Sequence, residues 1–271
     1  MARCASSPTA TNWRCAMADR PGRHLRLEAG ERGVSDVVGF VLVFGLIIGT
    51  VGAVYTTGLS GLQDARDAER LSNAEVAFDV LDSNADDVLH RGAPARATEI
   101  KLSDARIGPG DPVTVNVSAG PNASVSREIT PIVYSADDTD IVYVQGAVIR
   151  SQRSGGVMLR PSGIRTGERA LFPIVDTYFP VGTTVGGQTR ALVRFRVPTP
   201  SDRAVRTLTT ATNDTVTVTV QTSRTDPWRR HLDAYDNTTC DGDAANDTVT
   251  CEFSGVETAV VPVTTVHVRV A

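Results

Sequence analysis

The sequence predicts an α+β protein, in which a long N-terminal helix, first hydrophobic and then amphipathic, precedes an antiparallel, β-rich, sandwich-like domain. Two observations support this fold class. Residues 37–63 contain no charged side chain, and residues 64–90 then repeat apolar residues at helical spacing. From residue 97 onward, short segments alternate polar and apolar side chains between clusters of Gly, Pro, Asp and Asn, as expected for strands and turns.

The first segment, residues 1–33, is a basic leader. It carries six arginines and three acidic residues, a balance of +3, whereas residues 34–271 carry 21 basic and 28 acidic residues, a balance of −7. Two starts are open, Met1 or Met17, and the second gives a shorter leader. The segment before Met17 shows no periodicity, so no structure is predicted for it.

The second segment, residues 34–63, is predicted to be a transmembrane helix. Val37 to Tyr55 is an almost unbroken apolar run, and about 20 helical residues span the ~30 Å hydrocarbon layer of a membrane. A helix of a soluble core normally shows a polar face, which this run lacks. The run is also longer than the apolar region of an ordinary secretory signal.

The flanking charges predict the orientation. Arginines precede the apolar run and few acids lie among them, so the positive-inside rule keeps the leader in the cytoplasm. We therefore expect a single-pass protein of the cell membrane, in contact with lipid, whose C-terminal domain lies outside the cell. Within the apolar run, Gly45 and Gly49 form a GxxxG pair, which favours close approach of two helices and is a candidate subunit contact.

The third segment, residues 64–92, is predicted to be an amphipathic stalk helix that ends at Gly92 and Pro94. Its apolar residues follow spacings of three and four: Leu71, Ala74, Phe78, Leu81, Ala85 and Val88. Two interpretations stay open at this stage. The stripe packs either on the protein's own β-domain or on the same stripe of neighbouring subunits.

The fourth segment, residues 93–271, is predicted to be the exported β-rich domain. A short helix interrupts the strands, since Asp226 and Pro227 are typical of a helix start and the pattern continues to Tyr235. The predicted strands are residues 98–102, 113–117, 141–144, 191–197, 215–220, 248–253 and 260–270.

Two kinds of covalent site are predicted in this domain. Cys240 and Cys251 flank a turn-rich segment, which outside the cell favours a disulfide. Their spacing does not resemble a zinc motif, and no metal site is predicted. Five asparagines lie in Asn-X-Ser/Thr sequons and are predicted glycosylation sites: Asn116, Asn122, Asn213, Asn237 and Asn246.

Composition excludes several function classes. An acidic body without a basic stripe argues against a nucleic-acid partner. The chain contains none of the catalytic or phosphate-binding motifs that mark common enzyme classes, so neither an enzymatic activity nor a cofactor is predicted. Aspartate outnumbers glutamate by 22 to 9 and Lys101 is the only lysine, a balance that favours a halophilic, archaeal source.

The junction between leader and helix carries a resemblance. Arg32-Gly33-Val34-Ser35-Asp36 followed by a long apolar helix is similar to the class III signal of archaeal, and in particular haloarchaeal, type IV prepilins and archaellins. The resemblance implies a prepilin peptidase as partner, cleavage after Arg32 and Gly33, and a mature chain that starts at Val34 and keeps its helix.

One residue departs from the family pattern. Many haloarchaeal pilins have Ser-Pro where this chain has Ser35 and Asp36. Asp36 is a candidate subunit contact, because its carboxylate can pair with the terminal ammonium of a neighbouring subunit; alternatively it lies at the membrane interface and contacts water.

The resemblance implies a type IV pilin-like cell-surface subunit, anchored by its N-terminal helix, whose exported domain serves subunit contact or adhesion, with other pilin-like subunits as partners. The alternative is an unprocessed single-span surface protein with a structural or sensory β-domain that does not polymerise. A third hypothesis, an exported β-rich enzyme or ligand-binding module, has no motif in its favour.

Overall fold

The computed structural model of the protein describes residues 32–210, 215–243 and 245–271, and residues 32–36 by their backbone alone. The chain divides into two compact units, one that ends at Ser60 and one from Gly61 to Ala271. A long N-terminal helix followed by a strand-rich domain confirms the predicted α+β class.

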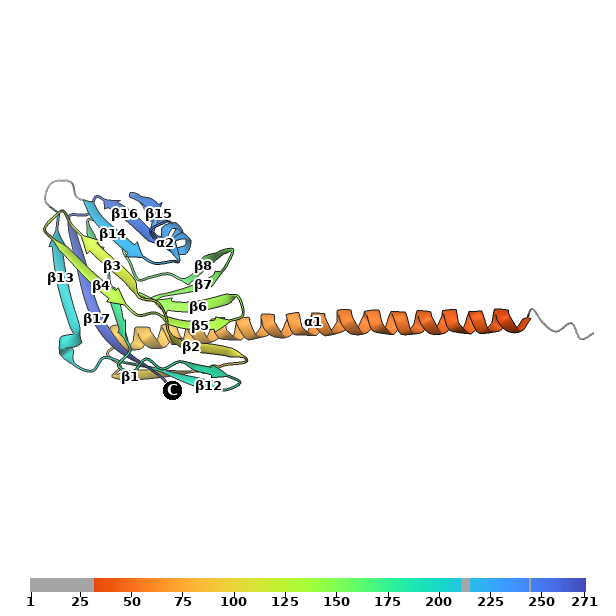
Figure 1. Cartoon of the computed structure of the whole chain (residues 1–271). Helices are drawn as coiled ribbons and strands as arrows, with labels where there is room; N and C mark the ends of the chain where they lie inside the picture. Colours follow the sequence, from red (N-terminus) through yellow and green to blue (C-terminus); the bar gives the residue numbers. More distant parts are fainter. Residues whose placement is uncertain (1–31, 211–214, 244) are drawn as a thin grey trace, which may run out of the picture. The chain divides into compact units, whose positions relative to one another are not determined.

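Helix α1 runs from Arg32 to His90 and includes both the predicted membrane segment and the predicted stalk (Figure 1). It ends where predicted: Gly92 adopts a positive φ of 74°, which glycine accepts without steric cost. The N–H of Ala93 then bonds back to the carbonyl of Asp87 at 3.0 Å, so the last turn has a hydrogen-bond partner.

The strands of the described residues form three sheets, which we call A, B and C. Sheet A contains β1 (Ala95–Lys101), β9 (Arg169–Leu171), β10 (Ile174–Tyr178), β12 (Arg190–Arg196), β13 (Arg203–Thr209) and β17 (Thr258–Val270). Sheet B contains β2 (Ala105–Pro109), β5 (Ile132–Ala136), β6 (Thr139–Val144), β7 (Ala147–Gln152), β8 (Gly155–Arg160) and β11 (Val185–Gly187). Sheet C contains β3 (Val113–Ser118), β4 (Ser124–Ile129), β14 (Thr215–Gln221), β15 (Thr238–Asp243) and β16 (Thr248–Ser254).

Pairing is antiparallel throughout sheets B and C, as predicted. In sheet A, β9 and β10 pair with β17 in parallel, which the sequence pattern did not indicate. Strand β17 is long enough to pair with β9 and β13 near its start and with β10 and β12 farther along. It therefore joins short strands from distant parts of the sequence into one sheet.

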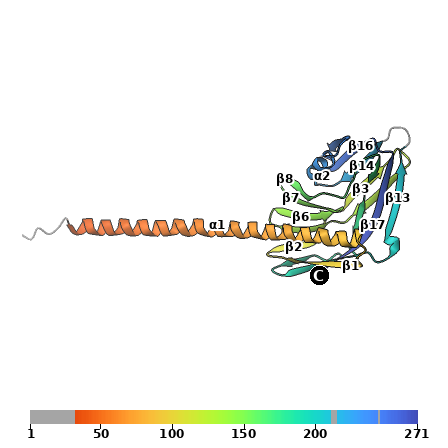
Figure 2. The ribbon, with the colours of Figure 1, turned by 180° about the vertical axis from the view of Figure 1, so that it is seen from behind.

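Sheet B lies between two hydrophobic cores. Val142 and Val144 of β6 face the first core, with the inner side of sheet C, whereas Ile141 and Tyr143 face the second core, with α1 and sheet A. All four residues are buried, because both faces of the strand are covered. Figure 2 shows sheet B from behind, with the C-terminal turns of α1 passing beside β2 and β6.

The apolar stripe of the stalk belongs to the second core. Phe78, Leu81 and Val88 are completely buried, and Leu71 packs at the margin. Phe78 lies edge-on to Tyr134 of β5, with 6.3 Å between ring centroids. Of the two open interpretations, the structure therefore shows the first: the stripe packs on the protein's own β-domain.

The interrupting helix α2 spans Thr225–Leu232. Its N-cap is Arg224, so Asp226 lies in the first turn rather than at the cap, and the helix stops before Tyr235. Trp228 and Leu232 are buried in the first core, and Tyr235 packs partly against it, so the predicted apolar side of the segment is present. A short 3₁₀ helix, η1 (Pro200–Asp202), precedes β13.

Candidate functional site

The N-terminal part of α1 is the first candidate for a functional element. Among the described residues, one helix is long and apolar enough to cross a membrane, and it begins its apolar stretch at Val37. Phe40, Leu46 and Val54 are about 70% exposed, so the protein itself leaves this surface uncovered. Such a surface is stable in lipid and unfavourable in water.

The threonine and serine hydroxyls of this stretch donate hydrogen bonds to carbonyls of their own helix. The hydroxyl of Thr50 donates to the carbonyl of Ile47 at 2.9 Å, and that of Thr57 donates to Ala53 at 2.8 Å. Ser60 bonds to Thr57 at 3.0 Å in the same way. Internal donation of this kind lets hydroxyl groups lie in a medium without water.

The predicted processing and contact residues lie at the start of this helix. Arg32, Gly33, Val34 and Asp36 belong to the first turns of α1, and their side chains are outside the described part of the chain. The leader up to residue 31, with Cys4, Cys15 and Met17, is also outside it. Cleavage and an ion pair at Asp36 therefore stay predictions.

Gly45 and Gly49 leave a shallow strip on α1, since a Cβ added at either would meet no atom within 4 Å. This geometry permits a second helix to approach closely. A subunit contact there stays a prediction.

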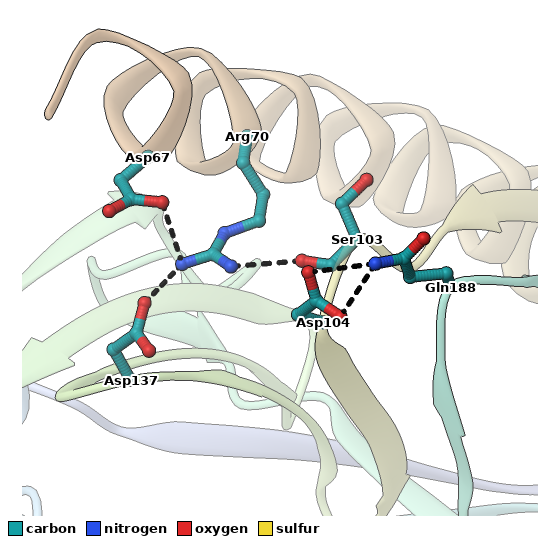
Figure 3. A network of polar contacts seen from close by, with 6 residues as sticks. All are labelled: Asp67, Arg70, Ser103, Asp104, Asp137 and Gln188. Carbon is teal, nitrogen blue, oxygen red and sulfur yellow. Dashed lines mark hydrogen bonds and ion pairs between the residues drawn. The ribbon is translucent and has the colours of Figure 1, made fainter. Parts of the chain in front are cut away.

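The second candidate element is the attachment of the stalk to the β-domain, which centres on Arg70 (Figure 3). Its guanidinium donates to the carbonyl of Ser103 at 2.9 Å and pairs with Asp137 in the β5–β6 turn and with Asp67 on the preceding helical turn. The Arg70 side chain is only 13% exposed, and its Nε has no hydrogen-bond partner among the described residues. One arginine thus joins α1 to two separate loops.

Beside Arg70, Asp104 accepts hydrogen bonds from the amide of Gln188 at 3.1 and 3.3 Å. This bond joins the loop after β1 to the turn before β12, so the loop that presents Ser103 to Arg70 is itself held in place (Figure 3).

Two more ion pairs join the stalk to sheet B. Glu75 pairs with Arg150 of β7 at 2.8 Å, and Asp79 pairs with Arg160 at the end of β8. Their side chains are about a third to a half exposed, so solvent screens each pair and its contribution is at most about 1 kcal/mol. Together with Arg70 they hold successive turns of α1 against the same sheet.

Asp82 is the most perturbed acid of the stalk. Burial, reinforced by the nearby charge of Asp86 and opposed by Arg160, raises the pKa of Asp82 to about 6. Burial also raises the pKa of Tyr143, whose hydroxyl has no hydrogen-bond partner among the described residues. The stalk therefore carries one carboxylate that lies unfavourably close to the core.

A serine and a histidine meet near α2 but do not form a catalytic pair. Ser162 Oγ lies 2.9 Å from Nε2 of His231, yet Ser162 is only 4% exposed, which closes it to a substrate. Among the described residues, the side-chain partners of the His231 ring nitrogen are the hydroxyls of Ser162 and Tyr235, and neither is acidic. Burial lowers the pKa of His231, so the contact fits a neutral histidine that fills the first core's edge.

The predicted glycosylation sites that the structure describes all lie on sheet C or its connections. Asn116 is in β3, between Thr219 of β14 and Ser126 of β4. The other three are exposed: Asn122 in the β3–β4 turn, Asn237 before β15 and Asn246 in the β15–β16 turn. Asn213 lies outside the described residues.

The predicted disulfide is present. Cys240 of β15 and Cys251 of β16 lie directly opposite each other in the ladder, with Cα atoms 4.1 Å apart, and their sulfurs are bonded. The bond joins an edge strand of sheet C to its neighbour, and Cys251 is buried in the first core.

The fold and these elements define a class: a single-pass membrane protein with a β-rich domain attached to the end of its membrane helix. The chain belongs to a family described as "Family of unknown function (DUF7289)", whose profile matches residues 32–269. The matched residues include both α1 and the β-domain, so the family is defined by the helix and the domain together. Comparison with curated proteins and with solved structures found no match in either case.

Proposed function

We propose that the protein is a type IV pilin-like subunit of a cell surface, anchored by α1, with its β-domain outside the cell for subunit contact or adhesion. The observation that carries the proposal is the division of α1: the same helix has an exposed apolar part from Val37 and a part, around Phe78, that is integral to the domain core. A cleavable anchor would not need to continue into the core.

The junction at Gly33 and Val34 supports the proposal, because it resembles a class III prepilin signal. Cleavage there by a prepilin peptidase would remove the basic leader and leave α1 from Val34 onward. The mature helix would then stay in the membrane or pass, with its apolar surface covered by other subunits, into a filament.

The distribution of sequons supports an outside location for the β-domain. Asn122, Asn237 and Asn246 are exposed at turns of one sheet, as glycosylated asparagines of an exported domain are. The outward side chains of that sheet are hydroxyls, amides and carboxylates, such as Thr217, Thr250 and Glu252. A halophilic archaeal cell fits this acidic composition.

Recovery from sheared cells tests the proposal. We expect the native protein in the sheared surface fraction, and we expect Gly33→Val, which alters the residue before the cleavage point, to remain entirely in the membrane fraction. The matched control is Gly58→Val, which changes a glycine of the same helix outside the junction. If wild type and both variants all remain in the membrane fraction, the protein is a permanently anchored surface protein and does not polymerise.

A further inference from the structure

A polar cleft of about 370 Å³ lies between the turn that joins β7 to β8 and helix α2. Three arginines line it: Arg150 from β7, and Arg229 and Arg230 from the last turn of α2. Gln152 and Ser154 add neutral hydrogen-bond donors. Strands and helix far apart in the sequence thus bring three arginines to the lining of one cleft, although the guanidinium of Arg150 is bonded to Glu75 of α1.

The shape of the cleft is part of the fold. A Cβ at Gly156 would lie 2.8 Å from Pro227 Cγ and 3.1 Å from the carbonyl oxygen of Arg150, so β8 approaches α2 more closely than any larger residue permits. Arg230 joins the same two elements, because it donates to the carbonyls of Gly156 and Asp226. No ligand is needed to hold the walls in position.

The charges of the three arginines are incompletely neutralised. Arg150 pairs with Glu75 at 2.8 Å, but Arg230 donates only to carbonyl oxygens, which carry no net charge. The stem of Arg229 lies against Gly242, and its guanidinium makes no hydrogen bond or ion pair with the described residues. Since Glu75 neutralises Arg150, the cleft keeps two arginines, Arg229 and Arg230, against one carboxylate, Asp226, in a chain whose residues 34–271 carry 28 acidic against 21 basic groups.

We propose that this cleft binds a small oxyanion, namely a sulfate, a phosphate or a carboxylate, with Arg229 as its main ligand and Arg230 in support. One guanidinium group can bind two oxygens of such an anion through two parallel N–H···O hydrogen bonds. The volume is at the lower end of small-ligand sites, and the polar lining suits an oxyanion rather than an apolar molecule. This oxyanion site does not depend on cleavage of the leader or on polymerisation of the protein.

Isothermal titration calorimetry of the full chain in detergent, at constant ionic strength, tests the site with three probes: sodium sulfate, sodium phosphate and sodium glucuronate. We expect saturable binding of at least one probe with one site per chain. Since charged hydrogen bonds from Arg229 contribute most to the affinity, Arg229→Gln is expected to weaken probe binding about tenfold or more. Arg229→Lys keeps the positive charge but loses the paired N–H donors of the guanidinium, and its affinity is expected to lie between those of wild type and Arg229→Gln.

The matched control is Arg206→Gln, which removes an exposed arginine of β13 and is expected to bind as wild type does. Three results would overturn the proposal: wild type binds none of the probes saturably, Arg229→Gln binds as tightly as wild type, or Arg206→Gln loses as much affinity as Arg229→Gln. The last would show a general charge effect. An unchanged near-ultraviolet spectrum of the buried Trp228 verifies that each variant is folded.

Discussion

The two parts of α1 have the same secondary structure and opposite surroundings. From Val37 to Leu62 apolar side chains cover every face of the helix and are exposed, whereas from Leu71 to Val88 a single apolar stripe is buried and the other faces carry charge. The first pattern fits a helix surrounded by lipid or other helices, and the second fits a helix that covers its own domain. Helix propensity alone does not distinguish them; the width of the apolar surface does.

The strongest test of this difference compares two phenylalanines of the same helix. Phe78→Ala removes a fully buried ring and is expected to lower the free energy of unfolding of the β-domain by about 3–5 kcal/mol. Phe44→Ala, at a side chain that is 55% exposed, is expected to leave it unchanged. Urea unfolding of the full chain in detergent, followed by near-ultraviolet circular dichroism, measures both. Equal losses would show that both parts of the helix pack alike.

The next largest effect is expected at Arg70. Arg70→Ala removes the charged donor to Ser103 and both carboxylate contacts, and is expected to cost about 2–3 kcal/mol in the same unfolding experiment. Arg66→Ala, one turn earlier and exposed, is the matched control and is expected to change stability little. Similar values for the two variants would contradict the assigned role of Arg70.

A smaller effect of opposite sign is expected at Asp82. Because its pKa is raised from 3.8 to about 6 in the folded chain, the folded state binds more protons between these values, and stability falls as pH rises from about 4 to 6. Asp82→Asn is expected to remove that loss and to stabilise the domain by about 1–2 kcal/mol at pH 7, and not at pH 3.

The control for Asp82 is Ser83→Ala, a change on the exposed side of the same turn, which is expected to leave the pH dependence of unfolding as in wild type. A destabilised Asp82→Asn variant at pH 7 would show that the Asp82 charge is favourably paired.

No change of domain stability is expected in the membrane part of α1, where substitutions act on association instead. Gly45→Leu with Gly49→Leu is expected to reduce chemical cross-linking between copies in membranes, because leucine side chains fill the strip that permits close approach. Gly58→Leu, also uncovered and outside the GxxxG pair, is the control. Unchanged cross-linking in the double variant would exclude this face as the contact.

The fold class and the helix were predictable, because their signals are local: uncharged residues 37–63, and a stripe of spacing three and four that ends at Gly92. Strands with strong alternation, such as Thr215–Gln221, were predictable for the same reason. Strand β2 was missed, because Gly108 and Pro109 are typical of turns yet pair here with β5. Strand β15 was missed because it is polar and gains its order from pairing with β16 and from the disulfide.

The Arg70 network and the arginine cleft were not predictable, because their members come from distant parts of the chain. An arginine on the polar face of an amphipathic helix is normally solvated, and the sequence contains no sign that Ser103 and Asp137 approach Arg70. Likewise, Gly156 resembles an ordinary hairpin glycine in the sequence, which does not indicate that Pro227 packs against it. Such sites depend on sheet order, which follows from many weak pairings at once.

We propose that α1 from Val34 onward remains with the mature protein, while the leader before Val34 is removed. Mass spectrometry of the N-terminal peptide of the native protein, purified from its own membranes, tests this most directly. We expect the first residue to be Val34, with every residue of α1 from Val37 onward retained. An intact leader would contradict processing, and a chain that starts beyond Leu62 would contradict the membrane helix itself.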